Sequence, residues 1–84
     1  MEKLGRFIKR QRRSKKITMK DYCKKLGKSR AFMYHVEESV KIPSAELLDA
    51  IASILDIDIK LLLLMAYLEK IAIYDKSIKE DYRQ

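Results

Sequence analysis

Helix-breaking residues are scarce in this chain, and their scarcity constrains its fold more than any other feature of the sequence. Glycine occurs only at positions 5 and 27, and proline only at position 43. The stretches between these positions lack the alternation of apolar β-branched and polar residues that marks a half-buried strand. Their apolar residues recur instead at spacings of three and four, the period of a helix with one buried face. The sequence therefore predicts an all-α chain.

Capping residues divide the chain into five expected helices. The side chains of Thr18, Ser29 and Asp58 are suited to accept a hydrogen bond from the first turn of a following helix. Gly27 is suited to end a helix, and Pro43 precedes the start of another. The expected helices cover residues 2–14, 19–26, 30–38, 45–55 and 59–82.

Charge is distributed unevenly along the chain, whose formal net charge is +7. Residues 1–43 carry 14 Lys or Arg against four acidic residues, and residues 44–84 carry five against eight, so the two parts have net charges of +10 and −3. The basic part is expected to face a polyanion, most commonly nucleic acid and less often a membrane surface. A basic surface that serves only solubility is the alternative.

Chain length and cysteine content limit the class of protein. A chain of 84 residues forms one small domain with little room for a deep catalytic cleft. Its single cysteine, Cys23, favours a reducing setting inside the cell. The longest apolar run, residues 61–68, is far shorter than the roughly 20 residues of a membrane-spanning helix, and no signal peptide is visible. We therefore expect a cytoplasmic, nucleoid-associated protein with no membrane partner.

Two short helices joined by residues 26–29 form the pattern of a helix-turn-helix. With this pair, the chain resembles the phage-repressor and Cro type of helix-turn-helix domain, also called the xenobiotic-response-element family. The resemblance covers residues 4–65 and rests on Leu4-Gly5, Ile8, Arg12, Ile17-Thr18, Cys23, Leu26-Gly27, Ser29, Met33, Val36, Glu37, Pro43 and residues 47–57. It implies a five-helix lambda-repressor-like domain, here expected at residues 1–66, with residues 67–84 extending the last helix.

The chain departs from the pattern of the family at several positions. Met19 replaces the usual glutamine at the start of the second helix, which puts the contact made from that position in doubt. Ser39 replaces the usual glycine after the third helix, which leaves the geometry of that turn open. Tyr22 and Cys23 replace a leucine and an alanine and imply altered helix packing.

The third helix is expected to have one core face and one open face. At about 100° per residue, Val36 and Glu37 fall within about 60° of Met33, and the open side lies opposite them. The resemblance implies that the open side enters the major groove of DNA, with Ser29 among the groove-facing residues. The predicted base-contacting residues are Arg30, Ala31, Phe32, Tyr34 and His35.

Each predicted base-contacting residue has a chemical reason, and four of the five have an alternative role. Arg30 is the strongest candidate, because a guanidinium can bond to O6 and N7 of guanine together. Ala31 and Phe32 are candidates for thymine methyl contacts, and Tyr34 and His35 for a base edge or a phosphate. The alternatives are solvated surface roles for Arg30 and His35 and packing roles for Tyr34 and Phe32. The predicted phosphate-binding residues are Thr18, Lys20, Lys28, Ser29 and Lys41.

Arg12 and Glu37 lie on apolar helix faces, where a lone charge would be very unfavourable. The family commonly pairs these two positions, so we expect a buried ion pair that fixes the third helix. A surface glutamate at a frayed helix end is the alternative.

The last expected helix carries more apolar residues than a minimal domain needs. They are spaced by three and four, as in helices that pair. We expect this surface to meet a second copy of the chain, and packing back on its own core is the alternative. The predicted interface residues are Leu64, Tyr67, Leu68, Ile71, Tyr74 and Ile78.

These features together favour a homodimeric, sequence-specific DNA-binding transcriptional regulator, a repressor that occupies a pseudo-palindromic operator on double-stranded DNA. One rival is a helix-turn-helix adaptor that acts through an unknown protein partner and binds DNA weakly, and another is an RNA-binding protein. One histidine and one cysteine do not supply the familiar zinc spacings. No catalytic residue, metal or cofactor is predicted.

Overall fold

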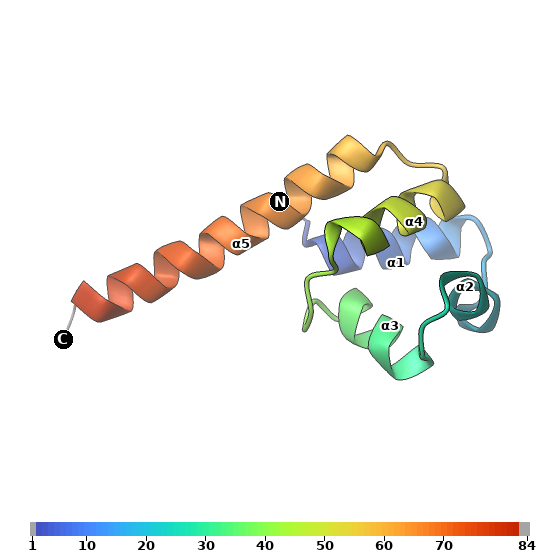
Figure 1. The fold of residues 1–84 in the computed structure, drawn as a ribbon, viewed down its shortest axis with the longest axis horizontal. Helices are drawn as coiled ribbons and strands as arrows, with labels where there is room; N and C mark the ends of the chain where they lie inside the picture. The colour runs from blue at the N-terminus through green and yellow to red at the C-terminus, as the bar shows by residue number, and fades with distance from the viewer. Residues whose placement is uncertain (1, 83–84) are drawn as a thin grey trace.

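The computed structural model describes residues 2–82, with side chains described for residues 2–75. Within that part of the chain it contains helices and no strand, which confirms the all-α prediction (Figure 1). The helices are α1 (Leu4–Ser14), α2 (Met19–Leu26), α3 (Arg30–Glu37), α4 (Ala45–Leu55) and α5 (Ile59–Tyr82).

Two boundaries differ from the expected ones. α1 begins at Leu4 and not at Glu2, because Lys3 takes an extended conformation and the Glu2 side chain bonds to Arg10. α3 ends one residue earlier than expected, because Glu38 is its C-cap and the chain turns at the next residue.

Local capping bonds explain where the middle helices start and stop. The hydroxyl oxygens of Thr18, Ser29 and Ser44 each accept a bond from the amide three residues later, at 3.1 to 3.2 Å. Gly27 ends α2 in the left-handed conformation, with a φ of 66°, which a residue without a Cβ adopts at little cost. This sharp end brings α3 against α2 after a short turn.

One apolar core holds the five helices together. α1 contacts both α3 and α5, α2 contacts α3 and α4, and α4 packs against α5. Among the residues whose side chains are described, α5 contributes to the core from its first half, through Leu62, Met65 and Ala66. The largest fully buried side chains are Leu4, Ile8, Tyr22, Met33, Val36, Leu48, Ile51, Leu55 and Leu62.

The first turn of α1 lies directly on the last turn of α3. A Cβ on Gly5 would approach the carbonyl oxygens of Val36 to 2.3 Å and of Glu37 to 2.8 Å, so only glycine permits this contact. The chain then leaves α3 through Ser39, which takes a left-handed φ of 61°. The turn where the family usually has glycine therefore places a serine in the left-handed region.

α5 also reaches the start of α1. The Glu69 Oε1 atom accepts a hydrogen bond of 2.6 Å from the Leu4 amide, although the two residues are 65 positions apart. Lys3, the N-cap of α1, provides no side-chain cap of its own. Glu69 supplies that missing acceptor and lies three residues beyond the boundary expected at Ala66.

The second half of α5 projects away from the other four helices (Figure 1). The chain is accordingly elongated, with extents of 47, 25 and 21 Å. Among the described residues, no helix combines the length and the apolar character needed to cross a membrane.

Candidate nucleic-acid interface

α3 presents one buried side and one exposed side. Its buried residues are Met33, Val36 and Glu37. The residues on the other side, Arg30, Ala31, Tyr34 and His35, are exposed, and Phe32 is half-buried at the edge. The structure thus brings four of the five predicted base-contacting residues together on the open side of a single anchored helix, while Phe32 packs partly against the core at its edge.

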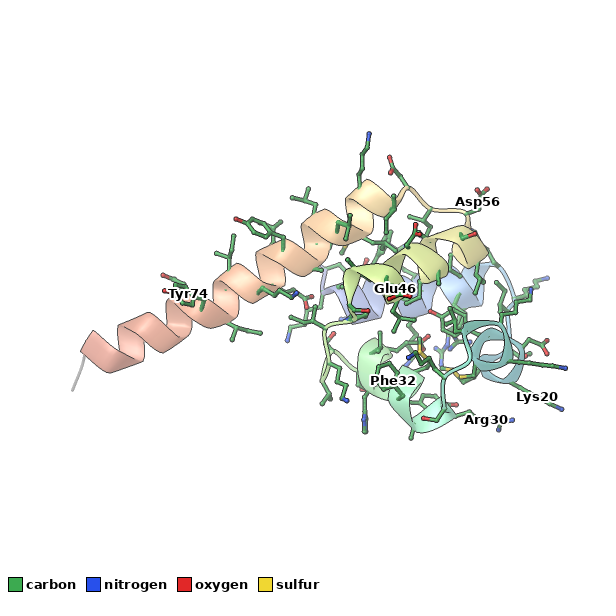
Figure 2. The ribbon with its side chains drawn as sticks, viewed as in Figure 1. Lys20, Arg30, Phe32, Glu46, Asp56 and Tyr74 are labelled. Atoms are coloured by element: carbon green, nitrogen blue, oxygen red, sulfur yellow. The ribbon has the colours of Figure 1, made fainter. Side chains whose placement is uncertain are left out.

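Arg30 occupies the first position of α3, directly after the Ser29 cap. Its side chain points outward, as does Lys20 of α2, on the side of the molecule away from α5 (Figure 2). Among the described residues, Arg30 forms no ion pair or side-chain hydrogen bond. Its guanidinium is therefore accessible to a ligand.

Phe32 gathers two of the predicted phosphate-binding lysines at one edge of α3. The Nζ atoms of Lys28 and Lys41 lie 5.5 and 4.9 Å from the centroid of its ring. Contacts of this kind between an ammonium and an aromatic face are attractive. This edge, called here the Phe32 edge, consists of Lys28, Phe32 and Lys41.

The predicted phosphate-binding residues Thr18, Lys20, Lys28, Ser29 and Lys41 are all exposed. Thr18 and Ser29 use their hydroxyl oxygens as acceptors in capping bonds. Each hydroxyl keeps its own hydrogen as a donor, which an anion at the helix N-terminus can accept.

Arg12 and Glu37 form a buried ion pair with two hydrogen bonds. The Arg12 Nε and Nη2 atoms donate to the two carboxylate oxygens of Glu37 at 2.8 and 3.0 Å, and Nη1 donates to the carbonyl oxygen of Ile17 at 2.8 Å. Both side chains are more than nine-tenths buried. The bonds to Glu37 raise the pKa of the Arg12 guanidinium above its usual value. The pair thus connects α1 to α3, and the bond to Ile17 connects α1 to the turn that precedes α2.

Tyr22 lies fully buried beneath this ion pair, and the Arg12 guanidinium is 5.8 Å from the centroid of its ring. In the described part of the chain, the Tyr22 hydroxyl has no hydrogen-bond partner. Burial raises the pKa of this phenol, so it stays protonated. The altered packing implied by a tyrosine here therefore includes an unpaired polar atom in the core.

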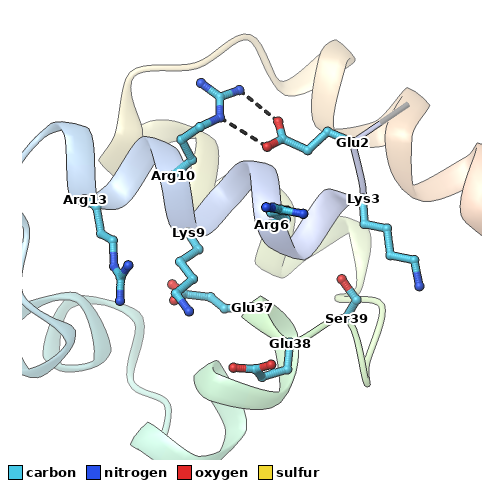
Figure 3. A pocket seen from close by; sticks show the side chains of 9 residues that line it. All are labelled: Glu2, Lys3, Arg6, Lys9, Arg10, Arg13, Glu37, Glu38 and Ser39. Atoms are coloured by element: carbon cyan, nitrogen blue, oxygen red, sulfur yellow. Dashed lines mark hydrogen bonds and ion pairs between the residues drawn. The ribbon is translucent and has the colours of Figure 1, made fainter.

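A basic hollow of about 580 Å³ lies between α1 and the end of α3 (Figure 3). Sequence reasoning missed it as a site. Arg10 is paired with Glu2 at its rim, at 2.8 Å. Its remaining basic residues form no ion pair with a described residue, and they are Lys3, Arg6, Lys9 and Arg13. The spacing of Arg6, Lys9 and Arg13 was the available signal, because it places cations along one side of a helix.

The predicted interface residues on α5 are exposed where their side chains are described. Leu64, Tyr67, Leu68, Ile71 and Tyr74 all belong to this group. Tyr74 lies far along α5, away from the other helices (Figure 2). The remaining predicted residue, Ile78, falls outside the residues whose side chains are described.

Comparison with protein families matches residues 8–62 to the family described as helix-turn-helix. The chain belongs to this family, in its phage-repressor and Cro branch. This helix-turn-helix protein is 33% identical over 61 residues to the "ImmF control region 10 kDa protein" of Bacillus phage phi105. The aligned part covers 73% of this chain and 68% of that protein. No solved structure matches the chain. Membership of the family makes the protein a DNA-binding regulator.

Proposed function

We propose that this helix-turn-helix protein is a transcriptional repressor that binds a pseudo-palindromic operator as a homodimer. The observation that carries the proposal is the exposed side of α3, which faces outward while the opposite side is anchored in the core. In the helix-turn-helix mode, this recognition helix enters the major groove and places its first residues at the base edges.

Arg30 has the main role in base recognition. It is the first residue of the recognition helix, exposed and free of ion pairs with described residues. A guanidinium that bonds to both O6 and N7 of guanine discriminates against other bases by about 1–3 kcal/mol. Ala31 and Phe32 contact thymine methyl groups in this proposal, and Tyr34 and His35 contact a base edge or a phosphate.

Phosphate contacts supply most of the affinity and orient the recognition helix without selecting sequence. Thr18 and Lys20 lie at the N-terminus of α2, and Ser29 lies at the N-terminus of α3. Lys28 and Lys41 lie at the Phe32 edge. All five are exposed and therefore open to a DNA backbone.

α5 has apolar residues on two opposite faces, which supports the homodimer. Counting about 100° per residue from Leu64, the core residues Leu62, Met65 and Ala66 lie at about 100° to 200°. On the same count, Tyr67 and Ile71 lie within about 60° of Leu64, on the far side of the helix. A face this apolar beyond the core is typical of a protein interface.

The spacing along that outer face fits pairing with a second helix. Leu64, Tyr67, Ile71, Tyr74 and Ile78 alternate steps of three and four, which is the a/d pattern of helices that pack side by side. The face belongs to the acidic part of the chain, so a second copy there leaves the basic surfaces free for DNA. We therefore place DNA binding in residues 1–66 and dimerisation in residues 67–84 together with Leu64.

Repression follows from occupancy in this proposal. A dimer with one recognition helix in each half-site covers the surface of the operator and excludes other proteins from it. The similarity to a phage protein named for a control region supports a role in regulating genes.

Selection of bound duplexes from a random pool tests this function directly. We expect a two-fold symmetric consensus with half-site centres about 34–36 Å apart, one helical turn. Arg30→Ala should relax the consensus at one base pair, or two adjacent pairs, in each half-site. Lys28→Ala should keep the consensus and weaken all duplexes alike.

The rival functions predict different results. A helix-turn-helix adaptor would show a preference of about tenfold or less for any duplex, far below the ratio of specific regulators. An RNA-binding protein would bind single strands more tightly than duplexes. An unaltered consensus from the Arg30 variant would show that Arg30 does not contact bases.

A further inference from the structure

The basic hollow beside α1 contains more positive charge than the fold uses. Arg10 forms an ion pair with Glu2, and Glu37 forms an ion pair with Arg12. Four cations of the hollow, Lys3, Arg6, Lys9 and Arg13, have no ion-pair partner in the described part of the chain. Like charges held together repel one another, so this cluster favours an anionic ligand.

The position of the hollow relative to α3 indicates which anion. Tyr34 and Phe32 mark the two edges of the exposed side of α3, about 160° apart around the helix. The Phe32 edge carries Lys28 and Lys41. The hollow lies at the opposite edge, because Glu37, Glu38 and Ser39 from the end of α3 form part of its wall. The exposed side of α3 is thus bordered by cations on both sides.

We infer that the basic hollow binds the phosphate backbone of DNA on the second side of the major groove. A helix in this groove, which is about 12 Å wide, has one phosphate strand on each side. The Phe32 edge meets one strand, and Lys9 and Arg13 of the hollow meet the other. The inference rests on the proposed insertion of α3 and adds a contact surface on a different helix.

The spacing of the cations along α1 suits an extended polyanion. Arg6, Lys9 and Arg13 follow one another at three and four residues, and the span from first to last is about 10 Å at 1.5 Å per residue. A row of this length spans more than one phosphate of a DNA strand, whose charges are spaced about 3.4 Å apart along the DNA axis. The row therefore suits a chain of phosphates better than a single small anion, which would contact only part of it.

The negative charge of Glu38 offers a way to test whether the hollow binds an anion. Its carboxylate lies at the hollow, is exposed and forms no ion pair with a described residue (Figure 3). A phosphate strand in the hollow would be repelled by this charge. Removing the charge should therefore strengthen DNA binding, whereas removing a neighbouring cation should weaken it.

Salt-dependent binding to a random-sequence duplex of 20 base pairs, followed by fluorescence anisotropy, tests the inference. Lys9→Gln and Arg13→Gln should each weaken binding roughly three- to tenfold near physiological salt and reduce the salt slope by about 1. Glu38→Gln should tighten binding by a similar factor. All three positions are at the surface, and thermal unfolding will show that the variants remain folded.

Lys60→Gln is the matched control, because Lys60 is an exposed cation at the start of α5. It should leave the salt slope unchanged. Equal effects of Lys60→Gln and Arg13→Gln, or unchanged slopes for Lys9→Gln and Arg13→Gln, would overturn the inference. If Arg30→Ala still alters the selected consensus in that case, the proposed function stands without this contact. If the unsubstituted chain binds no duplex, both fail.

Discussion

At the scale of single residues, the ion pair of Arg12 and Glu37 is the contact that most directly holds the recognition helix. Breaking the pair from either side, by Arg12→Met or Glu37→Gln, should lower the free energy of unfolding by about 3–5 kcal/mol, because one buried charge loses its partner. The double variant should lose less than the sum of the two. Urea unfolding of the four proteins measures the coupling between the residues.

The exposed pair of Arg10 and Glu2 is the control for that cycle. Its 2.8 Å contact is similar in length, yet Arg10 is exposed and Glu2 is only half-buried. Arg10→Ala should therefore change stability little. Additive losses in the Arg12 and Glu37 cycle would mean that the two side chains do not interact in solution.

Removing the unpaired hydroxyl of Tyr22 should increase stability, whereas breaking the ion pair should decrease it. A buried polar atom without a partner is unfavourable by about 1–3 kcal/mol, and phenylalanine keeps the ring while removing that atom. Tyr22→Phe should raise the free energy of unfolding by about 1 kcal/mol. Tyr22→Leu should lower it, because the smaller side chain leaves a cavity. A loss of stability in Tyr22→Phe would indicate that the hydroxyl is bonded in solution.

At the scale of helices, the bond from the Leu4 amide to Glu69 links the last helix to the first. Glu69→Ala should lower the free energy of unfolding by about 1–2 kcal/mol, because the Leu4 amide at the start of α1 loses its side-chain acceptor. Hydrogen exchange at the Leu4 amide should accelerate. Glu69→Gln retains an acceptor oxygen and should lose less stability than Glu69→Ala.

Ser44→Ala is the control that distinguishes faster exchange at the Leu4 amide from a general loss of stability. Ser44 caps α4 through the Leu47 amide, so its removal should cost about 1 kcal/mol while exchange at Leu4 stays slow. Fast exchange at Leu4 in the unsubstituted protein would contradict the bond.

At the scale of the whole molecule, the outer face of α5 determines how many recognition helices act together. Ile71→Asp places a charge in the centre of the proposed interface and should convert a dimer to a monomer in sedimentation at micromolar concentration. Affinity for the full operator should then fall far more than affinity for a half-site, because two linked contacts become independent.

Ala72→Asp introduces the same carboxylate one residue along, about 100° away around α5. It should leave the sedimentation coefficient and operator affinity nearly unchanged. A dimer that persists in the Ile71 variant would place the interface elsewhere.

Local signals in the sequence were sufficient for much of the fold. The caps Thr18 and Ser29 and the left-handed end at Gly27 act within a few residues, so the bounds of α2 follow from neighbouring positions alone. Arg12 and Glu37 each place a charge on an apolar face, which showed that each needs a partner, and the resemblance to the family indicated that they pair with each other. The base, phosphate and interface residues remain predictions, although the structure shows which of them are exposed.

Contacts distant in sequence could not be predicted in the same way. The bond between Glu69 and Leu4 depends on the angle at which α5 crosses α1, which no short pattern encodes. The basic hollow requires the relative position of α1 and α3, set by the contact at Gly5. The missing partner of Tyr22 depends on the detailed packing beneath Arg12.

The two apolar faces of α5 have a consequence for how the regulator responds to its own abundance. In the proposed pairing, when chains are scarcer than the dissociation constant of the dimer, the amount of dimer varies with the square of the amount of chain. Doubling the supply then raises the dimer about fourfold, and halving it by growth and division lowers the dimer to about a quarter. A small change in synthesis or degradation is thereby converted into a steep change in operator occupancy. The protein would act as a threshold element without binding any small-molecule signal.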